Sequence, residues 1–280
     1  MSRSFTPDDP AGPSAGRRPV ALVTGASAGL GREFAAQLAR EGYDLVLVAR
    51  DAGRLRALAQ ELRESSNADC EVLGADLSRD DDVSRVVERI DQSPIDLLVN
   101  NAGFGTRGSI ARTSREDQER MIRVHVLAAH HLALAAIKPM VKSGRGSVIN
   151  VSSIASWLTS PGNVNYSATK AWQRVFAESL SLETAARGVY VQALCPGYTR
   201  TEFHERGQMD MHHVPGWMWL SAERVVTESI RAVRRRRPVV VVPGLRYRAV
   251  TLVIRFLPRW CWRLLISAAR GTRRSGAPAP

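Results

Sequence analysis

The chain has 280 residues, 44% of them hydrophobic, and a formal net charge of +12 at pH 7. This is enough apolar sequence for a large core, which excludes a disordered chain and predicts one domain with tails. The cysteines, Cys70, Cys195 and Cys261, lack the spacing of a disulfide framework or a metal site. They therefore predict a reducing compartment and no bound metal.

Apolar runs and helical stretches alternate along most of the chain. Residues 1–17 lack the apolar run of a signal peptide and are expected to form a disordered tail. Residues 18–244 are expected to form one α/β domain, because strands that alternate with helices build a parallel sheet. About seven strands are predicted, at residues 20–23, 43–49, 70–74, 95–100, 146–151, 189–195 and 239–242.

The first predicted strand leads into a glycine-rich turn, TGASAGLG at residues 24–31, and then into a predicted helix over residues 32–40. Such a turn brings backbone N–H groups and a helix N-terminus to a pyrophosphate. Its spacing is G-x-x-x-G-x-G, which differs from the commoner G-x-G-x-x-G. The position between a strand and a helix predicts a dinucleotide-binding turn.

Arg50 stands at the end of the second predicted strand. An acidic residue there would bind the ribose 2′-hydroxyl of NAD, whereas an arginine can bind the 2′-phosphate of NADP. NADP(H) is therefore the preferred cofactor. Asp51 is adjacent, which leaves NAD(H) as the alternative, and Arg50 could also simply cap the strand at the surface.

Tyr166 and Lys170 lie four residues apart, so that on a helix they share one face. A phenol titrates near ~10, and a neighbouring ammonium would lower that pKa. Only three of the 39 basic residues are lysines, which suggests that Lys170 is kept for its compact charge. Ser153, thirteen residues before Tyr166, adds a hydroxyl that could polarise a carbonyl.

Five motifs together resemble the classical short-chain dehydrogenase/reductases over about residues 18–242: TGASAGLG, NNAG at residues 100–103, Ser153, Tyr166-x-x-x-Lys170 and PGYTRT at residues 196–201. The resemblance implies a Rossmann-type doubly wound sheet, Tyr166 as the catalytic acid/base, Ser153 on the substrate oxygen, and Lys170 on the nicotinamide ribose. It also implies a homodimer or homotetramer formed through helices near residues 114–138 and 166–186. The implied cofactor contacts are Gly25, Ser27, Gly29, Leu30, Gly31, Asp76, Asn100, Ala102, Pro196, Gly197 and Thr199.

His125 departs from the family pattern, which has an asparagine at this position to order a water near the lysine. A histidine could hold the water and carry a proton near neutral pH. Turnover would then fall more steeply below pH ~6.5. Alternatively, His125 is a packed helix residue and backbone groups hold the water.

The segment at residues 198–221 is expected to choose the substrate. In the family this loop covers the site, and apolar side chains there suit a lipophilic substrate. The alternative is a small hydrophobic cluster beneath a long loop. The apolar side chains are Phe203, Met209, Met211, Trp217, Met218 and Trp219.

Residues 245–280 are expected to form a basic amphipathic helical extension, kinked or restarted at Pro258. Two interpretations are open: residues 245–270 lie on an anionic membrane, or they pack on the enzyme or its partner. No nucleic-acid-binding motif accompanies the basic charge, so nucleic acid is not an expected partner. Five arginines are expected on one side, with Leu252, Leu257 and Ile266 opposite; the arginines are Arg248, Arg255, Arg259, Arg263 and Arg270.

The leading expectation is an NADPH-dependent reductase of a lipophilic ketone, such as a 3-oxoacyl compound, in the cytoplasm and peripherally on the membrane. An NADP-linked alcohol or steroid-type dehydrogenase is the second hypothesis. A non-catalytic cofactor sensor or membrane scaffold is the third, although it would not need Ser153, Tyr166 and Lys170 together.

Overall fold

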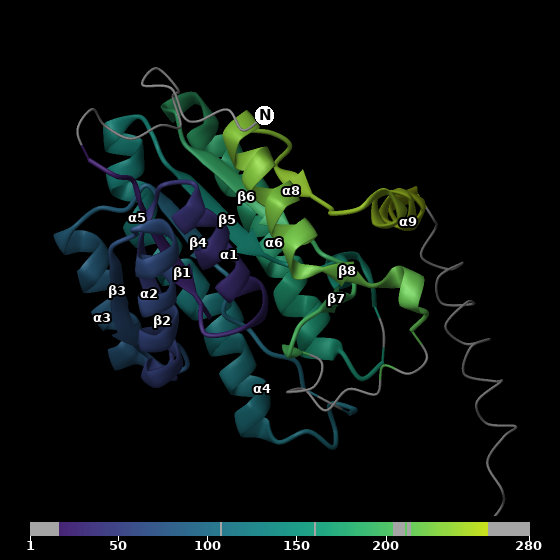
Figure 1. Ribbon diagram of the computed structural model, residues 1–280. Coiled ribbons are helices and arrows are strands. Elements are labelled where there is room, and N and C mark those ends of the chain that lie inside the picture. Colours follow the sequence, from purple (N-terminus) through teal and green to yellow (C-terminus); the bar gives the residue numbers. More distant parts are fainter. Residues whose placement is uncertain (1–16, 107, 160, 204–210, 212–213, 257–280) are drawn as a thin grey trace, which may run out of the picture.

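The computed structural model of the chain describes residues 17–106, 108–159, 161–203, 211 and 214–256 (Figure 1). Its centre is a seven-stranded parallel sheet with the strand order β3-β2-β1-β4-β5-β6-β9. All seven predicted strands are present, with ends that differ by at most two residues. Their bounds are β1 Val20–Thr24, β2 Asp44–Ala49, β3 Cys70–Gly74, β4 Leu97–Asn100, β5 Ser147–Val151, β6 Tyr190–Leu194 and β9 Val240–Val241.

Helices cover both faces of the sheet (Figure 1). One face carries α1 (Gly29–Arg40), α2 (Ala52–Ser66) and α8 (Ala222–Arg235). The other carries α3 (Asp80–Gln92), a long helix made of α4 (Arg115–Ile122), the π-helical turn η1 (Arg123–Ala128) and α5 (Ala129–Ser143), and α6 (Val164–Thr184). This two-sided arrangement is the predicted Rossmann-type doubly wound fold.

Alternate side chains of the central strands belong to the two cores. Val23 and Val99 lie in one core, and Leu22 and Leu98, their neighbours in sequence, lie in the other. This follows from the period of two along a strand, with both sheet faces covered. The crossovers from β1 and β4 leave toward opposite faces, so the carboxyl ends of these adjacent strands border a crevice where ligands bind in such folds.

The helix over residues 115–143 is long and apolar enough to cross a membrane by length and composition alone. Half of its apolar window is buried, however, and its inner side chains, such as Leu132 and Ala136, pack on the sheet. It is therefore a core helix of the α/β fold. Leu127 and Leu134 lie on its outer side and are 43% and 42% exposed.

The chain also contains a short parallel pair, β7 (Thr199–Arg200) and β8 (Leu220–Ser221), which the sequence did not predict. Two-residue strands are too short to show the alternation by which strands are recognised. Between them lies the 3-10 turn η4 (Gly216–Met218), and another, η2 (Ile154–Trp157), follows β5. The β7–β8 pair fixes both ends of the segment expected to cover the substrate.

Helix α9 (Leu245–Phe256) lies in the first part of the expected extension. Its buried residues are Tyr247 and Thr251. The expected separation of arginines from leucines was wrong, because Leu252 follows Arg248 by four residues and therefore shares its side of the helix. Residues 1–16 and 257–280 lie outside the described part, and with them Leu257, Arg259, Arg263, Ile266 and Arg270 of that pattern. Arg17 is described and pairs with Asp96, so the folded part includes it.

Candidate active site

The glycine-rich turn follows β1 and can be made only with glycines. Gly25 has a φ of +66°, and a Cβ at Gly31 would lie 2.1 Å from the Gly25 carbonyl oxygen. Helix α1 starts at Gly29 and has no side-chain cap at its N-terminus. Its first N–H groups can therefore bind a pyrophosphate, as predicted for this turn, which also contains Ser27 and Leu30.

Thr24 joins this turn to the loop after β4. Its hydroxyl oxygen accepts hydrogen bonds from the backbone N–H groups of Asn101 (2.9 Å) and Ala102 (3.0 Å). The Asn101 side chain donates to the Thr24 carbonyl oxygen at 2.8 Å. Thr24 and Asn101 thus hold the two loops together, with Ala102 at the predicted position. The sequence analysis missed both residues, although each lies within a recognised motif.

Asn100 lies at the carboxyl end of β4. Its amide is buried and donates to the Ala129 carbonyl oxygen and to Asn150 Oδ1, both at 3.0 Å. Its place in the adenosine ribose region stays a prediction, and its side-chain amide is already engaged. Asn100 fastens β4 to α5 and β5 beneath the site.

The adenosine side of the crevice contains two acidic residues that are already engaged. Asp51 caps α2 by accepting from the Arg54 backbone N–H at 3.0 Å, and it pairs with the Arg54 side chain at 3.5 Å. Asp76 accepts from both the N–H (3.0 Å) and the hydroxyl (2.7 Å) of Ser78. Burial alone would raise the pKa of Asp76, but these hydrogen bonds and the nearby Arg50 charge lower it. Arg50 is exposed and forms no ion pair with any residue in the described ranges.

Ser153 and Tyr166 meet beyond the carboxyl end of β5. Ser153 precedes the turn η2, Tyr166 lies in the first turns of α6, and the Ser153 hydroxyl is close enough to the Tyr166 phenol to lower its pKa. The adjacent Ser152 is buried, and its hydroxyl donates to the Lys170 carbonyl oxygen at 2.7 Å. The arrangement thus distinguishes the two serines as the sequence spacing predicted, with Ser153 at the tyrosine.

Lys170 is buried one helical turn below Tyr166. Its ammonium donates to the Val151 carbonyl oxygen (2.7 Å) and to Gln173 Oε1 (2.9 Å), and lies 5.8 Å from the centre of the Tyr166 ring. Burial lowers the pKa of Lys170 to about 7. Gln173, which shares the lysine's helix face at the i+3 position, was missed by the sequence analysis.

The expectation that Lys170 lowers the phenol pKa is not met in this structure. Tyr166 keeps part of its surface exposed, yet the protein around it raises its pKa to about 12, against a smaller lowering by the Ser153 hydrogen bond. Burial therefore outweighs the distant, already engaged ammonium. At neutral pH the phenol holds its proton.

His125 lies in the π-helical turn η1 and is fully buried. Its Nε2 accepts from the Phe104 backbone N–H at 3.0 Å, and its Nδ1 is 3.0 Å from the Thr169 hydroxyl, which donates onward to the Tyr166 carbonyl oxygen. A neutral imidazole with its proton on Nδ1 satisfies all these bonds.

Burial and the Lys170 charge hold the pKa of His125 well below 6.5. The expectation that it carries a proton near neutral pH is therefore wrong. The alternative of a packed helix residue fits better. Its ring centre lies 6.1 Å from that of Tyr166, so this packed residue supports α6 beside Tyr166.

The PG loop after β6 lies beside the serine turn. The Pro196 carbonyl oxygen accepts from the Ile154 N–H at 3.0 Å, next to Ser153. The buried Thr199 hydroxyl donates to the Gly197 carbonyl oxygen at 3.0 Å. These contacts put the predicted nicotinamide-side residues beside Ser153.

Tyr247 of α9 supports this loop from outside. A Cβ at Gly197 would lie 2.1 Å from the Tyr247 ring, so only glycine fits there. The Tyr247 hydroxyl accepts from the Tyr198 N–H at 3.0 Å and donates to the Met218 carbonyl oxygen at 2.6 Å. The residue thus ties the PG loop to the far end of the covering segment. This role was not predicted, because no local sequence pattern marks a tyrosine in a terminal helix.

The covering segment divides into two parts. The Phe203 ring centre lies 6.0 Å from that of Tyr166, as expected for a substrate-facing residue. Trp219 lies near Tyr198, and Met218 packs against the core, whereas Trp217 is 63% exposed. The described residues thus include a hydrophobic cluster, and the covering role of the segment stays a prediction; Met209 lies outside the described residues.

Comparison with known proteins agrees with this geometry. The family model for short chain dehydrogenases matches residues 19–211. Gluconate 5-dehydrogenase of Gluconobacter oxydans is 32% identical over 219 residues, which cover 75% of this chain and 85% of that protein.

Two solved structures extend the similarity to almost the whole chain. A short-chain dehydrogenase from Sphingobium yanoikuyae in complex with NADPH has a TM-score of 0.78 and 35% identity, and the match covers 93% of this chain and 96% of that one. The bulky-bulky ketone specific alcohol dehydrogenase from Comamonas testosteroni has a TM-score of 0.73 and 30% identity, with coverages of 94% and 97%. The chain therefore belongs to the short-chain dehydrogenase/reductase family and is an NAD(P)-dependent oxidoreductase that acts on alcohol or ketone groups.

Proposed function

We propose that this enzyme reduces a lipophilic ketone, with Ser153 and Tyr166 at the carbonyl and NADP(H) as the cofactor. The observation that carries the proposal is the Ser153 hydroxyl beside the Tyr166 phenol, with the Phe203 ring next to the Tyr166 ring. The glycine cradle between Gly25 and Gly31 leaves no room for a Cβ and so fits a pyrophosphate.

NADP(H) is supported by the arrangement at the end of β2. Arg50 is exposed there and can meet a 2′-phosphate, whereas the adjacent Asp51 carboxylate is engaged in capping α2. The similar structure from Sphingobium yanoikuyae holds NADPH. NAD(H) would require an acidic group free for the ribose hydroxyl, and Asp51 would first have to leave its cap.

The bound nicotinamide supplies the hydride. Ser153 hydrogen-bonds the ketone oxygen, and Tyr166 gives its proton to the alkoxide that develops there. A phenol whose pKa is raised to about 12 is protonated at neutral pH, which suits reduction of a ketone. Lys170 has used two of its three N–H donors on Val151 and Gln173, and the third can hold a ribose hydroxyl.

The substrate class follows from the side chains beside the pair. Phe203 is apolar and faces Tyr166. The names of the similar proteins mention compounds as different as gluconate and bulky ketones. The substrate class is therefore inferred from the side chains beside Ser153 and Tyr166. The second hypothesis, oxidation of an alcohol or steroid, uses the same residues in reverse. A cofactor sensor or scaffold would not need the serine–tyrosine pair.

The test is NADPH consumption with long-chain 3-oxoacyl, steroid and small polar ketones, beside NADP⁺ reduction with the matching alcohols. Ser153→Ala and Tyr166→Phe should abolish turnover with little change in NADPH binding, measured by cofactor fluorescence. Ser152→Ala is the matched control, because its hydroxyl supports α6 and does not face Tyr166. Turnover retained in Tyr166→Phe, or activity confined to small polar ketones, would refute the proposal.

We also propose a homodimer or homotetramer formed through the helices near residues 114–138 and 166–186. Leu127, Leu134 and Val175 on these helices are each more than 40% exposed. Exposed apolar surface of this kind is unfavourable in a monomer and indicates an interface. Light scattering should show an oligomer for the wild type and dissociation for Val175→Glu. A monomeric wild type would contradict this assembly.

We further propose that residues 245–270 touch an anionic membrane on its cytoplasmic side. Leu252, Val253 and Phe256 of α9 are 58%, 60% and 80% exposed, and Arg248 and Arg255 flank them. Such a face suits the interface of a bilayer. Leu252→Ser/Phe256→Ser should lose binding to anionic vesicles in co-sedimentation, whereas equal binding would argue for packing on the enzyme or a partner.

A further inference from the structure

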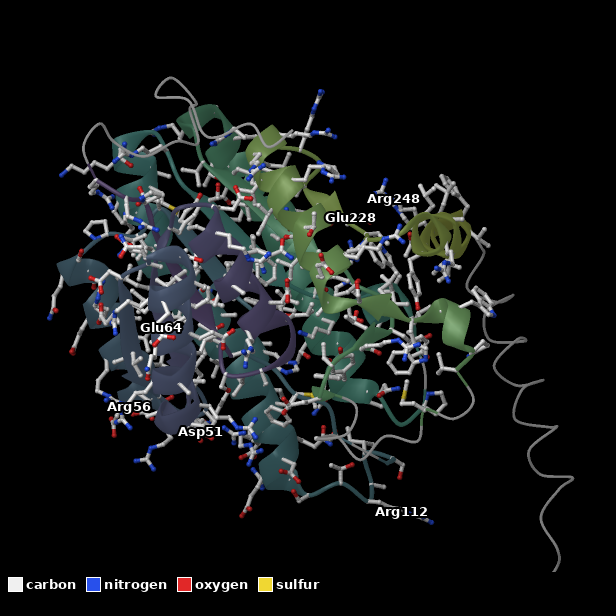
Figure 2. The ribbon with its side chains drawn as sticks, in the orientation of Figure 1. Asp51, Arg56, Glu64, Arg112, Glu228 and Arg248 are labelled. Atoms are coloured by element: carbon white, nitrogen blue, oxygen red, sulfur yellow. The ribbon has the colours of Figure 1, made fainter. Side chains whose placement is uncertain are left out.

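The outer edge of the domain contains a groove between α8, β9 and α9, with a volume of about 510 Å³. Figure 2 shows Glu228 of α8 and Arg248 of α9 facing each other across it. The groove lies at the edge of the sheet beyond β6, and none of the proposed catalytic or cofactor-binding residues lines it.

The lining of the groove is strongly basic. Among the described residues that line it, Glu228 is the single acidic one, and it pairs with Arg224 (3.1 Å) and Arg248 (2.9 Å). Among the described residues, no carboxylate pairs with the other lining arginines, and all of them are exposed. Those unpaired arginines are Arg231, Arg235, Arg237 and Arg255.

The same groove has an apolar wall. Leu245 and Leu252 line it and are 75% and 58% exposed, and the wall continues over the end of α9 to Phe256 at 80%. Guanidinium groups favour phosphate, and exposed leucine and phenylalanine favour acyl chains. A phosphate ester that carries acyl chains contains both of these groups in one ligand.

We propose that this groove binds the phosphate headgroup of an anionic phospholipid while the end of α9 enters the lipid surface. The inference rests on the membrane contact proposed above and adds the site and the headgroup chemistry. Residues 257–280 are a poor occupant, because they contain five arginines and no acidic residue. A second copy of this face would place arginines against arginines. Nucleic acid would leave the exposed leucines without an apolar partner.

The test compares binding to vesicles of phosphatidylcholine alone with binding to vesicles that also contain phosphatidylglycerol. The groove variant is Arg235→Gln/Arg237→Gln. The control is Arg56→Gln/Arg63→Gln on α2, which removes the same charge from exposed, unpaired arginines far from α9; Arg56 is labelled in Figure 2. NADPH turnover in solution should be unchanged in both, which shows that the variants fold.

The wild type should bind only the anionic vesicles, less at high salt. The groove variant should bind them roughly 25-fold more weakly, and the control should lose much less, because each basic residue at a lipid surface contributes about fivefold. Equal losses in the two variants would overturn the groove but leave the membrane contact standing.

Two further results would also decide the matter. No vesicle binding by the wild type would remove both the groove and the membrane contact. Salt-dependent DNA binding without vesicle binding would replace the lipid with nucleic acid. The Leu252→Ser/Phe256→Ser variant separates the membrane contact from the headgroup groove. If this variant loses vesicle binding while the groove variant binds fully, apolar insertion alone is supported.

Discussion

Acidification should destabilise this protein through His125. The imidazole is buried, and its neutral form already uses both nitrogens. Protonation would direct an Nε2–H toward the Phe104 N–H that now donates to it. The folded-state pKa lies well below 6.5, so the unfolded chain takes up the proton first as the pH falls.

Proton linkage gives the sign and size of the change in unfolding free energy. The stability that His125 contributes is fully present above its unfolded pKa of ~6.5 and declines as the pH falls toward its folded pKa. The slope approaches about 1.4 kcal/mol per pH unit, so the loss is about 1.4 kcal/mol at pH ~5.5 and about 2.7 kcal/mol at pH ~4.5 if the folded form is still neutral there.

The assay is urea unfolding at a fixed protein concentration between pH ~7.5 and ~4.5, where the unfolded histidine titrates. His125→Asn should flatten the decline of the unfolding free energy by these amounts, whatever its effect at pH ~7.5. His131→Asn, on the exposed side of α5, is the control and should leave the decline unchanged. Parallel curves for wild type and His125→Asn would refute the buried neutral imidazole.

Three other changes have defined outcomes. Gly197→Ala should cost about 1–3 kcal/mol of unfolding free energy in urea titrations and weaken NADPH binding, because its Cβ would lie 2.1 Å from the Tyr247 ring; an unchanged midpoint would contradict that contact. Tyr247→Phe removes two hydrogen bonds while keeping the ring, and steady-state kinetics should show KM for the ketone rising more than kcat falls; a purely structural role would lower only the amount of active enzyme. Arg50→Asp should weaken NADPH by about 10- to 100-fold relative to NADH, as expected for lost charge-assisted bonds, and an unchanged NADPH/NADH ratio would show that Arg50 is only a surface cap.

Most of the fold could be predicted because it rests on local patterns. Each central strand is an apolar run covered on both faces, and the strand–glycine turn–helix unit has a specific spacing. The Ser153 and Tyr166 pairing was likewise predicted from a fixed interval.

The features that could not be predicted depend on contacts between distant segments. Nothing near Asn100 indicates that its amide is consumed by Ala129 and Asn150. The pKa values of His125 and Tyr166 depend on how completely other helices bury them, which a single sequence does not record. The role of Tyr247 depends on a contact with Gly197, fifty residues earlier in the chain.

The contact between α9 and the PG loop makes that loop depend on a residue beyond the sheet. Synthesis runs from the N-terminus, and α9 follows the last strand of the sheet. A chain that ended after β9 would keep every strand of the sheet together with Ser153 and Tyr166, but it would lack Tyr247. Its loop at Gly197 would then have no outer support, so such a truncated chain should turn over poorly.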